Sequence, residues 1–179
     1  MLKLILMRHA KSSWDDPHAQ DIDRPLNKRG IKSAKAMGHW LRDNGHVPDA
    51  AVSSSSRRTM QTFEHLALTC PVAFTKHLYH ASEHWILDQL QQAKDESILL
   101  LGHNPGIGDF AERIVKTSPS HSDFERFPTC ATLVVTFESA TWENVAWAAG
   151  NVIDFAVPRD VINAQTQPAP LTKNIPGRV

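Results

Sequence analysis

The chain has 179 residues, of which 41% are hydrophobic and 21% are charged. This composition is typical of one folded globular domain and excludes a disordered or fibrous protein. Nineteen basic side chains balance nineteen acidic ones, so no overall charge attracts the chain to nucleic acid or to an anionic membrane. Recognition of an anion would have to come from a local cluster of basic groups.

The cysteines and the N-terminus indicate a cytoplasmic location. Cys70 and Cys130 are far apart and form no C-x-x-C pattern, which argues against a disulfide framework or a zinc knuckle. The apolar stretch before Arg8 is shorter than a signal-peptide core and far too short to span a bilayer. We therefore expect residues 2–7 to form a first β-strand.

The first third of the chain predicts a strand, a loop and a helix. Residues 2–7 are apolar without polar alternation, which is typical of a strand buried on both faces. Residues 11–25 are rich in aspartate and proline and are expected to be a loop. Asn27 can cap a helix that the Asn44-Gly45 pair ends.

A second strand is expected to end at residues 50–52, before a run of serines and a helix that opens with Arg57 and Arg58. Residues 72–79 predict a third strand. The intervening helix is expected to bury three apolar side chains, Met60, Phe63 and Ala67.

The second half continues the alternation of strands and helices. Ser82 can cap a helix, and residues 97–101 form the clearest buried strand, followed by another helix. Residues 131–137 and 145–155 predict a hairpin. We therefore predict a three-layer α/β/α sandwich with a mainly parallel central sheet. One domain is expected to span residues 1–179, with residues 165–179 as a surface tail.

Basic residues follow three of the predicted strands. Arg8 and His9 follow the first, Arg57 and Arg58 follow the second, and His103 follows residues 97–101. In open α/β sheets, sites form beyond the carboxyl ends of the strands. If the strands are neighbours, guanidinium groups that grip phosphate meet imidazoles that act as nucleophile, donor or proton carrier.

Four ordered stretches carry a resemblance to a known family. They are "LMRHAKSSW", "DRPLNKRG", "SSSSRRTMQT" and "LLGHNPG". Together they resemble the histidine phosphatase superfamily, and within it the short SixA-type phosphohistidine phosphatases, over residues 2–160. The resemblance implies a phosphoglycerate mutase-like fold without a large lid insertion, and a metal-independent phosphatase without a cofactor.

The resemblance also implies roles for individual residues. His9 would be the nucleophile, and Arg8, Arg58 and His103 would surround the phosphoryl group, or a phosphate or sulfate ion, in the pocket. The family pattern has its arginine three residues before the glutamine, which selects Arg58 over Arg57. Two arginines and a protonated His103 could neutralise the phosphoryl oxygens. A hydrogen bond from His9 to a backbone carbonyl would fix its tautomer.

The general acid stays open at this point. Larger relatives use a carboxylic acid, and the candidates here are Glu83 and four loop aspartates, Asp15, Asp16, Asp21 and Asp23. SixA-type proteins lack an obvious equivalent. An imidazole leaving group, whose conjugate acid has a pKa of about 6.5, departs readily once protonated. A missing acid therefore favours an N-linked phosphate.

The short segments between the motifs favour a protein as substrate. A pocket without a lid can accept the phosphohistidine side chain of a phosphotransfer domain. Three residues of the first loop could contact that partner protein: Lys11, Arg24 and Trp14. One alternative is a small-molecule phosphomonoesterase of the same superfamily. A second is a non-catalytic module that binds phosphorylated proteins. We expect neither nucleic acid nor a membrane as partner.

Other phosphatase and metal chemistries are disfavoured. A cysteine phosphatase needs C-x5-R, but Lys76 and Thr136 occupy the arginine position after the two cysteines. The chain has no P-loop motif, and no apolar strand precedes the D-x-D of residues 21–23. Three histidines straddle a predicted strand-to-helix junction without a cysteine partner, which argues against a metal site: His77, His80 and His84.

Overall fold

The computed structural model of the protein describes residues 1–166. Its strands are β1 (Leu2–Arg8), β2 (Ala50–Ser54), β3 (Val72–Thr75), β4 (Ser97–Gly102), β5 (Thr132–Phe137) and β6 (Asn151–Ala156). Its helices are α1 (Lys28–Asp43), α2 (Arg57–Leu66), α3 (Glu83–Gln91), α4 (Gly106–Ile114) and α5 (Pro158–Thr166). Short 3-10 helices are η1 (Asp21–Asp23), η2 (Lys76–Leu78) and η3 (Trp142–Asn144).

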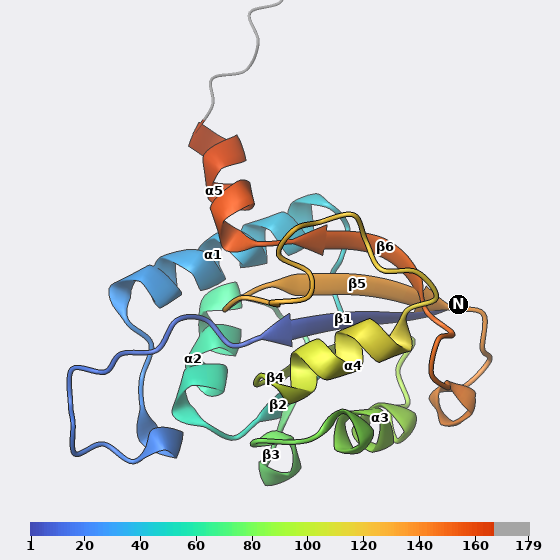
Figure 1. The fold of residues 1–179 in the computed structure, drawn as a ribbon, viewed down its shortest axis with the longest axis horizontal. Coiled ribbons are helices and arrows are strands. Elements are labelled where there is room, and N and C mark those ends of the chain that lie inside the picture. The colour runs from blue at the N-terminus through green and yellow to red at the C-terminus, as the bar shows by residue number, and fades with distance from the viewer. Residues whose placement is uncertain (167–179) are drawn as a thin grey trace, which may run out of the picture.

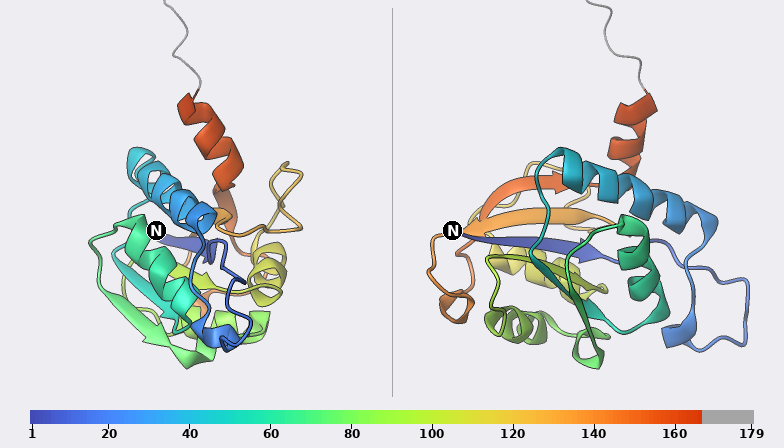
Figure 2. Two further views of the ribbon diagram at one scale, coloured as in Figure 1. Left: turned by 90° about the vertical axis from the view of Figure 1, so that its left-hand side faces the viewer. Right: turned by 180° about the vertical axis from the view of Figure 1, so that it is seen from behind.

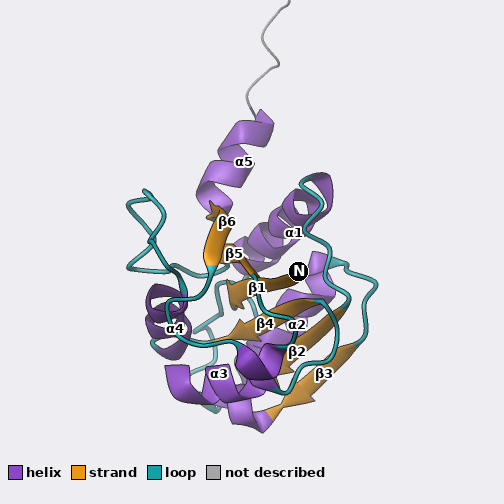
Figure 3. Cartoon of the chain, turned by 90° about the vertical axis from the view of Figure 1, so that its right-hand side faces the viewer, coloured by secondary structure: helices purple, strands orange, loops and turns teal. Residues whose placement is uncertain are grey.

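The strands form one six-stranded sheet in the order β3-β2-β4-β1-β5-β6. The first four strands are parallel, whereas β5 and β6 run antiparallel to their neighbours. The sheet twists from β3 to β6 (Figure 3). This order confirms the predicted mainly parallel α/β architecture, and no large insertion interrupts it within residues 1–166.

Helices cover both faces of the sheet. Helices α3 and α4 lie in front of it in Figure 1, whereas α1 and α2 lie in front in the view from behind in Figure 2. Alternate residues of β1 serve the two cores: Leu4 and Leu6 pack toward α3 and α4, and Ile5 and Met7 toward α1 and α2. Burial on both faces explains why this strand lacks polar alternation.

Local capping signals formed as the sequence predicted. The side chain of Asn27 accepts from Gly30 N and begins α1, and Ser82 accepts from Trp85 N and begins α3.

No helix within residues 1–166 combines the length and apolarity needed to cross a bilayer.

Two predicted strands are shorter than expected, and one helix was missed. The strand predicted at 72–79 ends at Thr75 and passes into η2, and the strand predicted at 145–155 starts only at Asn151. Helix α5 begins at Pro158, before the segment assigned to a surface tail, and extends into that segment as far as Thr166. A proline at the first helical position costs no hydrogen bond, because its missing N–H would have no partner there. Residues 167–179 of that predicted tail lie outside the described part of the chain.

The buried face of α2 differs from the prediction. Met60 is 42% exposed and Ala67 is exposed, while Phe63 is only half-buried. The helix instead buries Arg58, Thr59, Thr62 and Leu66. The first turn of α2 faces polar groups at the ends of the strands, so hydrophobic periodicity did not identify its inner face.

Candidate active site

Three parallel strands end level with one another. Arg8 is paired with Gly102 in β1 and β4, and Ser53 is paired with Leu101 in β2 and β4. The residues that follow these strands therefore emerge side by side, beyond the arrowhead of β1 in Figure 1. The imidazole centroids of His9 and His103 lie 5.1 Å apart.

His9 has one ring nitrogen fixed and one free. Nδ1 lies 2.7 Å from the carbonyl oxygen of Ala10 and donates to it, which makes Nε2 the unprotonated nitrogen. No side chain or backbone group within residues 1–166 forms a hydrogen bond with Nε2. Burial, with the charges of Arg58 and Arg8, lowers the pKa of His9 to about 3. His9 is therefore neutral at physiological pH, as a nucleophile requires.

Arg8 places a guanidinium group near His9 and Arg58. Its Nη1 donates to the carbonyl oxygen of Phe127 at 3.0 Å, and Asn104 Nδ2 donates to the same oxygen at 3.2 Å. Its Nε is buried without a partner among the described residues. Burial and the nearby charge of Arg58 lower the pKa of Arg8. A second positive charge and an unused donor make this a place where an anion is stabilised.

Arg58, the arginine selected by the sequence pattern, belongs to this cluster and Arg57 does not. Arg58 is 4% exposed, and its Nη2 lies 2.9 Å from Asp21 Oδ2. Its Nη1 donates to the backbone oxygen of Asp21. Arg57 points from the same helical turn to the solvent and is exposed.

The surroundings of His103 favour the neutral imidazole over the protonated one that could neutralise the phosphoryl oxygens. Burial, together with His9, Arg58 and His80, lowers its pKa to about 2. Its Nε2 lies 2.8 Å from Ser54 Oγ, and its Nδ1 is buried without a partner among the described residues. The two arginines therefore supply the positive charge of the site, and His103 offers a neutral hydrogen-bonding group.

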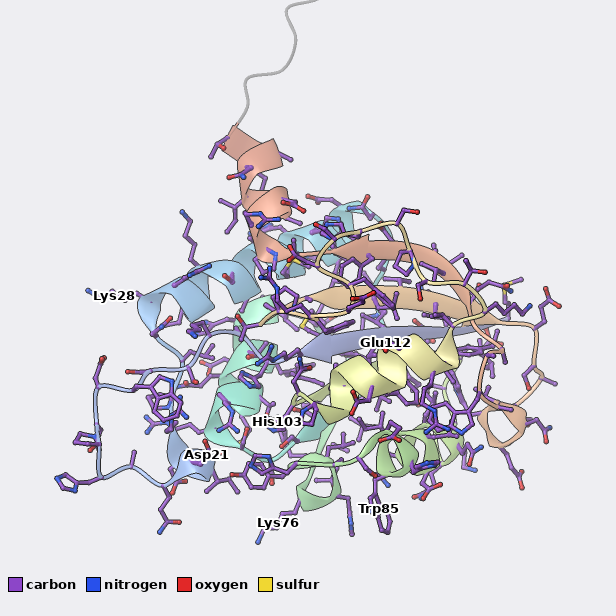
Figure 4. The ribbon with its side chains drawn as sticks, viewed as in Figure 1. Asp21, Lys28, Lys76, Trp85, His103 and Glu112 are labelled. Carbon is purple, nitrogen blue, oxygen red and sulfur yellow. The ribbon has the colours of Figure 1, made fainter. Side chains whose placement is uncertain are left out.

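Asp21 connects the first loop to the cluster and was one of several acids proposed from the sequence. Its Oδ2 accepts from Tyr79 Oη at 2.6 Å and lies 3.5 Å from His80 Nε2, while Oδ1 accepts from Arg24 Nη1 at 3.1 Å. Desolvation opposes its ionisation, but the hydrogen bonds from Tyr79 and Arg58 hold the pKa of Asp21 below its usual range. Figure 4 shows Asp21 and His103 on the same side of the molecule.

Tyr79 and His80 are neighbours of the cluster that sequence reasoning did not place there. The ring centroids of Tyr79 and His103 lie 5.4 Å apart, and those of His80 and His103 lie 5.8 Å apart. Both residues follow β3, whose carboxyl end adjoins that of β2. This topology was the signal that could have located them, but it requires knowledge of the strand order.

The predicted substrate contacts of the first loop differ from one another. Arg24 is 6% exposed, because it donates to Ser13 O and Ser12 Oγ and therefore ties the loop to itself. Its guanidinium carbon lies 3.1 Å from the ring centroid of Trp14. Arg24 is therefore not an exposed base, and its contact with a partner protein stays a prediction. Lys11 is exposed, and Trp14 is 73% exposed.

Glu83 does not join the cluster. Its carboxylate accepts from Arg113 Nη1 at 2.8 Å, at the far end of α4 from the histidines. No contact joins Glu83 to His9, His103 or either site arginine within the described residues. The interpretation of Glu83 as a catalytic acid is therefore not supported by its position, since it lies in the first turn of α3 and its carboxylate contacts Arg113 of α4. Within residues 1–166, no three His, Cys, Asp or Glu side chains are arranged to hold a metal ion.

A family model described as the histidine phosphatase superfamily (branch 1) matches residues 4–80. An uncharacterized protein of Mycobacterium tuberculosis is 34% identical over 162 residues, which cover 86% of this chain and 100% of that protein. The alignment therefore spans the whole of that relative and most of this chain.

Solved structures show the same fold. A SixA protein of Nakamurella multipartitia, described as a candidate phosphohistidine phosphatase, has a TM-score of 0.77 and 27% identity, covering 88% of this chain and 96% of that one. A protein histidine phosphatase SixA in complex with tungstate has a TM-score of 0.74 and 21% identity, covering 89% and 99%. At 21% identity, the similarity to the tungstate complex shows a shared fold and no more.

Proposed function

We propose that this chain, which belongs to the histidine phosphatase superfamily and is similar to its SixA-type members, hydrolyses phosphohistidine on a partner protein. The observation that carries the proposal is the state of His9. Its Nδ1–H is held by the carbonyl of Ala10, and its free Nε2 belongs to a site that also contains Arg8 and Arg58. A fixed, neutral nucleophile beside two permanent positive charges is suited to phosphoryl transfer.

The reaction would proceed in two steps. His9 Nε2 attacks phosphorus, the bond from phosphorus to the substrate nitrogen breaks, and the leaving imidazole takes up a proton from solvent or from a weak acid. Water then attacks phosphorus, the bond to Nε2 breaks, and inorganic phosphate departs. Arg8 and Arg58 would neutralise the oxygen charge in both transition states, and His103 would donate to one oxygen.

Two features support an N-linked phosphate as the substrate. The carboxylate at the site, Asp21, is held in its ionised form by Tyr79 and Arg58, so it does not supply the proton that a strongly basic alkoxide needs. An imidazole is a far weaker base and departs more easily. The first loop, residues 9–27, leaves Trp14 and Lys11 exposed, where a partner protein can contact them.

The test compares donors. A phosphorylated phosphotransfer domain and a panel of sugar, nucleotide and amino-acid phosphate esters are offered to the protein, and kcat/KM is measured for each. We expect the phosphotransfer domain to react fastest and His9→Ala to abolish turnover. A faster ester would make the chain a small-molecule phosphomonoesterase. Phosphoprotein binding by both wild type and His9→Ala, with no turnover in either, would indicate the non-catalytic module.

A further inference from the structure

The leaving group must depart toward the mouth of the site. In an in-line displacement, the nucleophile and the leaving atom lie on opposite sides of phosphorus. His9 is buried at the base of the site, so the leaving atom faces the exposed rim. Three polar side chains form this rim next to the buried cluster: Asp21, Tyr79 and His80.

Two of the three rim groups are poor proton donors. Asp21 is ionised, because Tyr79 and Arg58 donate to its carboxylate. Tyr79 already donates its hydroxyl proton to Asp21 Oδ2, and burial and that carboxylate raise the pKa of Tyr79. Asp21 and Tyr79 therefore share one proton in their hydrogen bond, and neither residue readily gives a proton to a leaving group.

His80, the third side chain of the rim, differs from Asp21 and Tyr79 in its exposure and contacts. Its side chain is 57% exposed, its Nε2 lies 3.5 Å from Asp21 Oδ2, and its ring is stacked near that of His103 at an interplanar angle of 27°. Its backbone is left-handed, with φ of 53°. A non-glycine residue in this conformation is uncommon, and such strain clusters at active sites. An imidazole exchanges protons near neutral pH.

We infer that His80 is the proton donor to the leaving group, and that Asp21 positions its imidazole. In the first step, the N–H of His80 gives its proton to the departing nitrogen or oxygen as the bond from that atom to phosphorus breaks. In the second step, neutral His80 takes a proton from the attacking water. The inference rests on phosphatase activity but not on the identity of the leaving group.

Several titratable and charged groups surround the His80 imidazole. Asp21 faces it from η1, Tyr79 precedes it with a ring centroid 4.2 Å away, and His103 lies beneath it after β4. Arg58 of α2 lies over the ring of Tyr79 at 5.8 Å.

The test varies the basicity of the leaving group in an aryl phosphate series from p-nitrophenyl to phenyl phosphate. His80→Asn is the variant, because asparagine tolerates the left-handed backbone. His84→Asn is the matched control: His84 is also exposed, but it contacts Glu83 and Arg113 instead of the cluster. A general acid contributes about 10²–10⁴-fold, and most for the poorest leaving group.

We expect His80→Asn to lower kcat/KM by about 10²-fold or more for phenyl phosphate and by much less for p-nitrophenyl phosphate. In a plot of kcat/KM against pH, the fall in rate at alkaline pH should be absent from His80→Asn. Added imidazole should restore activity to His80→Gly, whose shortened side chain leaves room at an exposed position. His84→Asn should resemble wild type throughout.

An equal loss across the series, with an unchanged pH profile and no rescue by imidazole, would overturn the role of His80. That outcome differs from failure of the proposed substrate, which would appear as a slow reaction with the phosphotransfer domain while the aryl series still reports on His80. Absence of turnover with every donor, N-phosphoryl imidazole included, would remove both proposals.

Discussion

Asp21 lies against Arg58, with Oδ2 2.9 Å from Nη2 and the backbone oxygen accepting from Nη1. An acidic residue of the first loop therefore occupies two donors of an arginine that the proposed reaction needs for phosphoryl oxygens. The same contact holds the guanidinium in a fixed position at the rim of the site. Asp21 should consequently weaken the binding of an anion while it orders the groups that act on it.

Replacement of Asp21 should separate binding from catalysis. Asp21→Asn removes a negative charge next to the anion site, so we expect tungstate or phosphate to bind about tenfold more tightly, which corresponds to ~1.4 kcal/mol. The value of kcat should fall, because Arg58 and His80 lose their common partner. Titration calorimetry and steady-state kinetics give the two values. Asp23→Asn, in the same 3-10 helix, is the control, and weaker anion binding in Asp21→Asn would contradict this account.

The adjacent arginines of α2 offer a matched pair. Arg58→Ala should lower kcat/KM by about 10²–10³-fold, because it removes a buried positive charge from the transition state. Arg57→Ala, which alters an exposed side chain one position earlier, should leave kcat/KM unchanged. Thermal unfolding of both variants separates this effect from loss of structure. Similar losses in the two variants would mean that Arg58 does not hold the phosphoryl group.

Replacement of Glu83 tests the carboxylate that the sequence suggested as an acid. Glu83→Gln weakens a pair with Arg113 at the surface between α3 and α4, and exposed pairs contribute little to stability. We expect kcat/KM to stay at the wild-type value for every leaving group. A loss that grows with leaving-group basicity would instead return Glu83 to the mechanism in place of His80.

The stability of the protein should fall as the pH falls below about 6.5. The folded-state pKa values of His9 and His103 are lowered to about 3 and about 2, so the unfolded chain binds protons that the folded chain does not. Each histidine then costs about 1.4 kcal/mol per pH unit below its unfolded pKa. Carboxylates such as Asp21 act in the same direction only nearer pH 4.

Urea unfolding between pH 4.5 and 7 measures this dependence. His103→Gln should reduce the slope of the unfolding free energy against pH by about 1.4 kcal/mol per unit at most, whereas His84→Gln should not change it. An identical slope in wild type and His103→Gln would show that His103 takes up protons equally in the folded and unfolded states.

Gly38 determines how closely α1 and α2 approach. A Cβ built at this position would lie 2.2 Å from the backbone oxygen of Leu66, so Gly38→Ala must push the two helices apart. We expect a loss of about 1–3 kcal/mol in unfolding free energy, which is typical of overpacking. Gly45→Asn is the comparison, because Gly45 has φ of +68° and open space around it, and asparagine accepts that backbone. Equal unfolding midpoints for the two variants would contradict this packing argument.

The regular elements near the sheet could be predicted from local patterns. An uninterrupted apolar run such as residues 97–101 needs only burial on both faces to be identified as a central strand, and Asn27 and Ser82 cap helices through contacts within three residues. Elements without such patterns were missed or misjudged. No element was predicted at the start of helix α5, which lies almost wholly before the predicted tail, and α2 buries polar side chains such as Thr59 and Thr62.

The sequence by itself determined that Arg8, His9 and His103 lie at the ends of buried strands, and its resemblance to the family pattern selected Arg58 over Arg57. Only the tertiary structure decided that Asp21 meets Arg58, that Arg24 is buried, that His80 stands at the rim and that Glu83 faces away. Strand ends are encoded locally, because an apolar run and its termination involve adjacent residues. The pairing of loop side chains and the loss of charge on His103 depend on strand order and burial, which arise only when distant segments pack together.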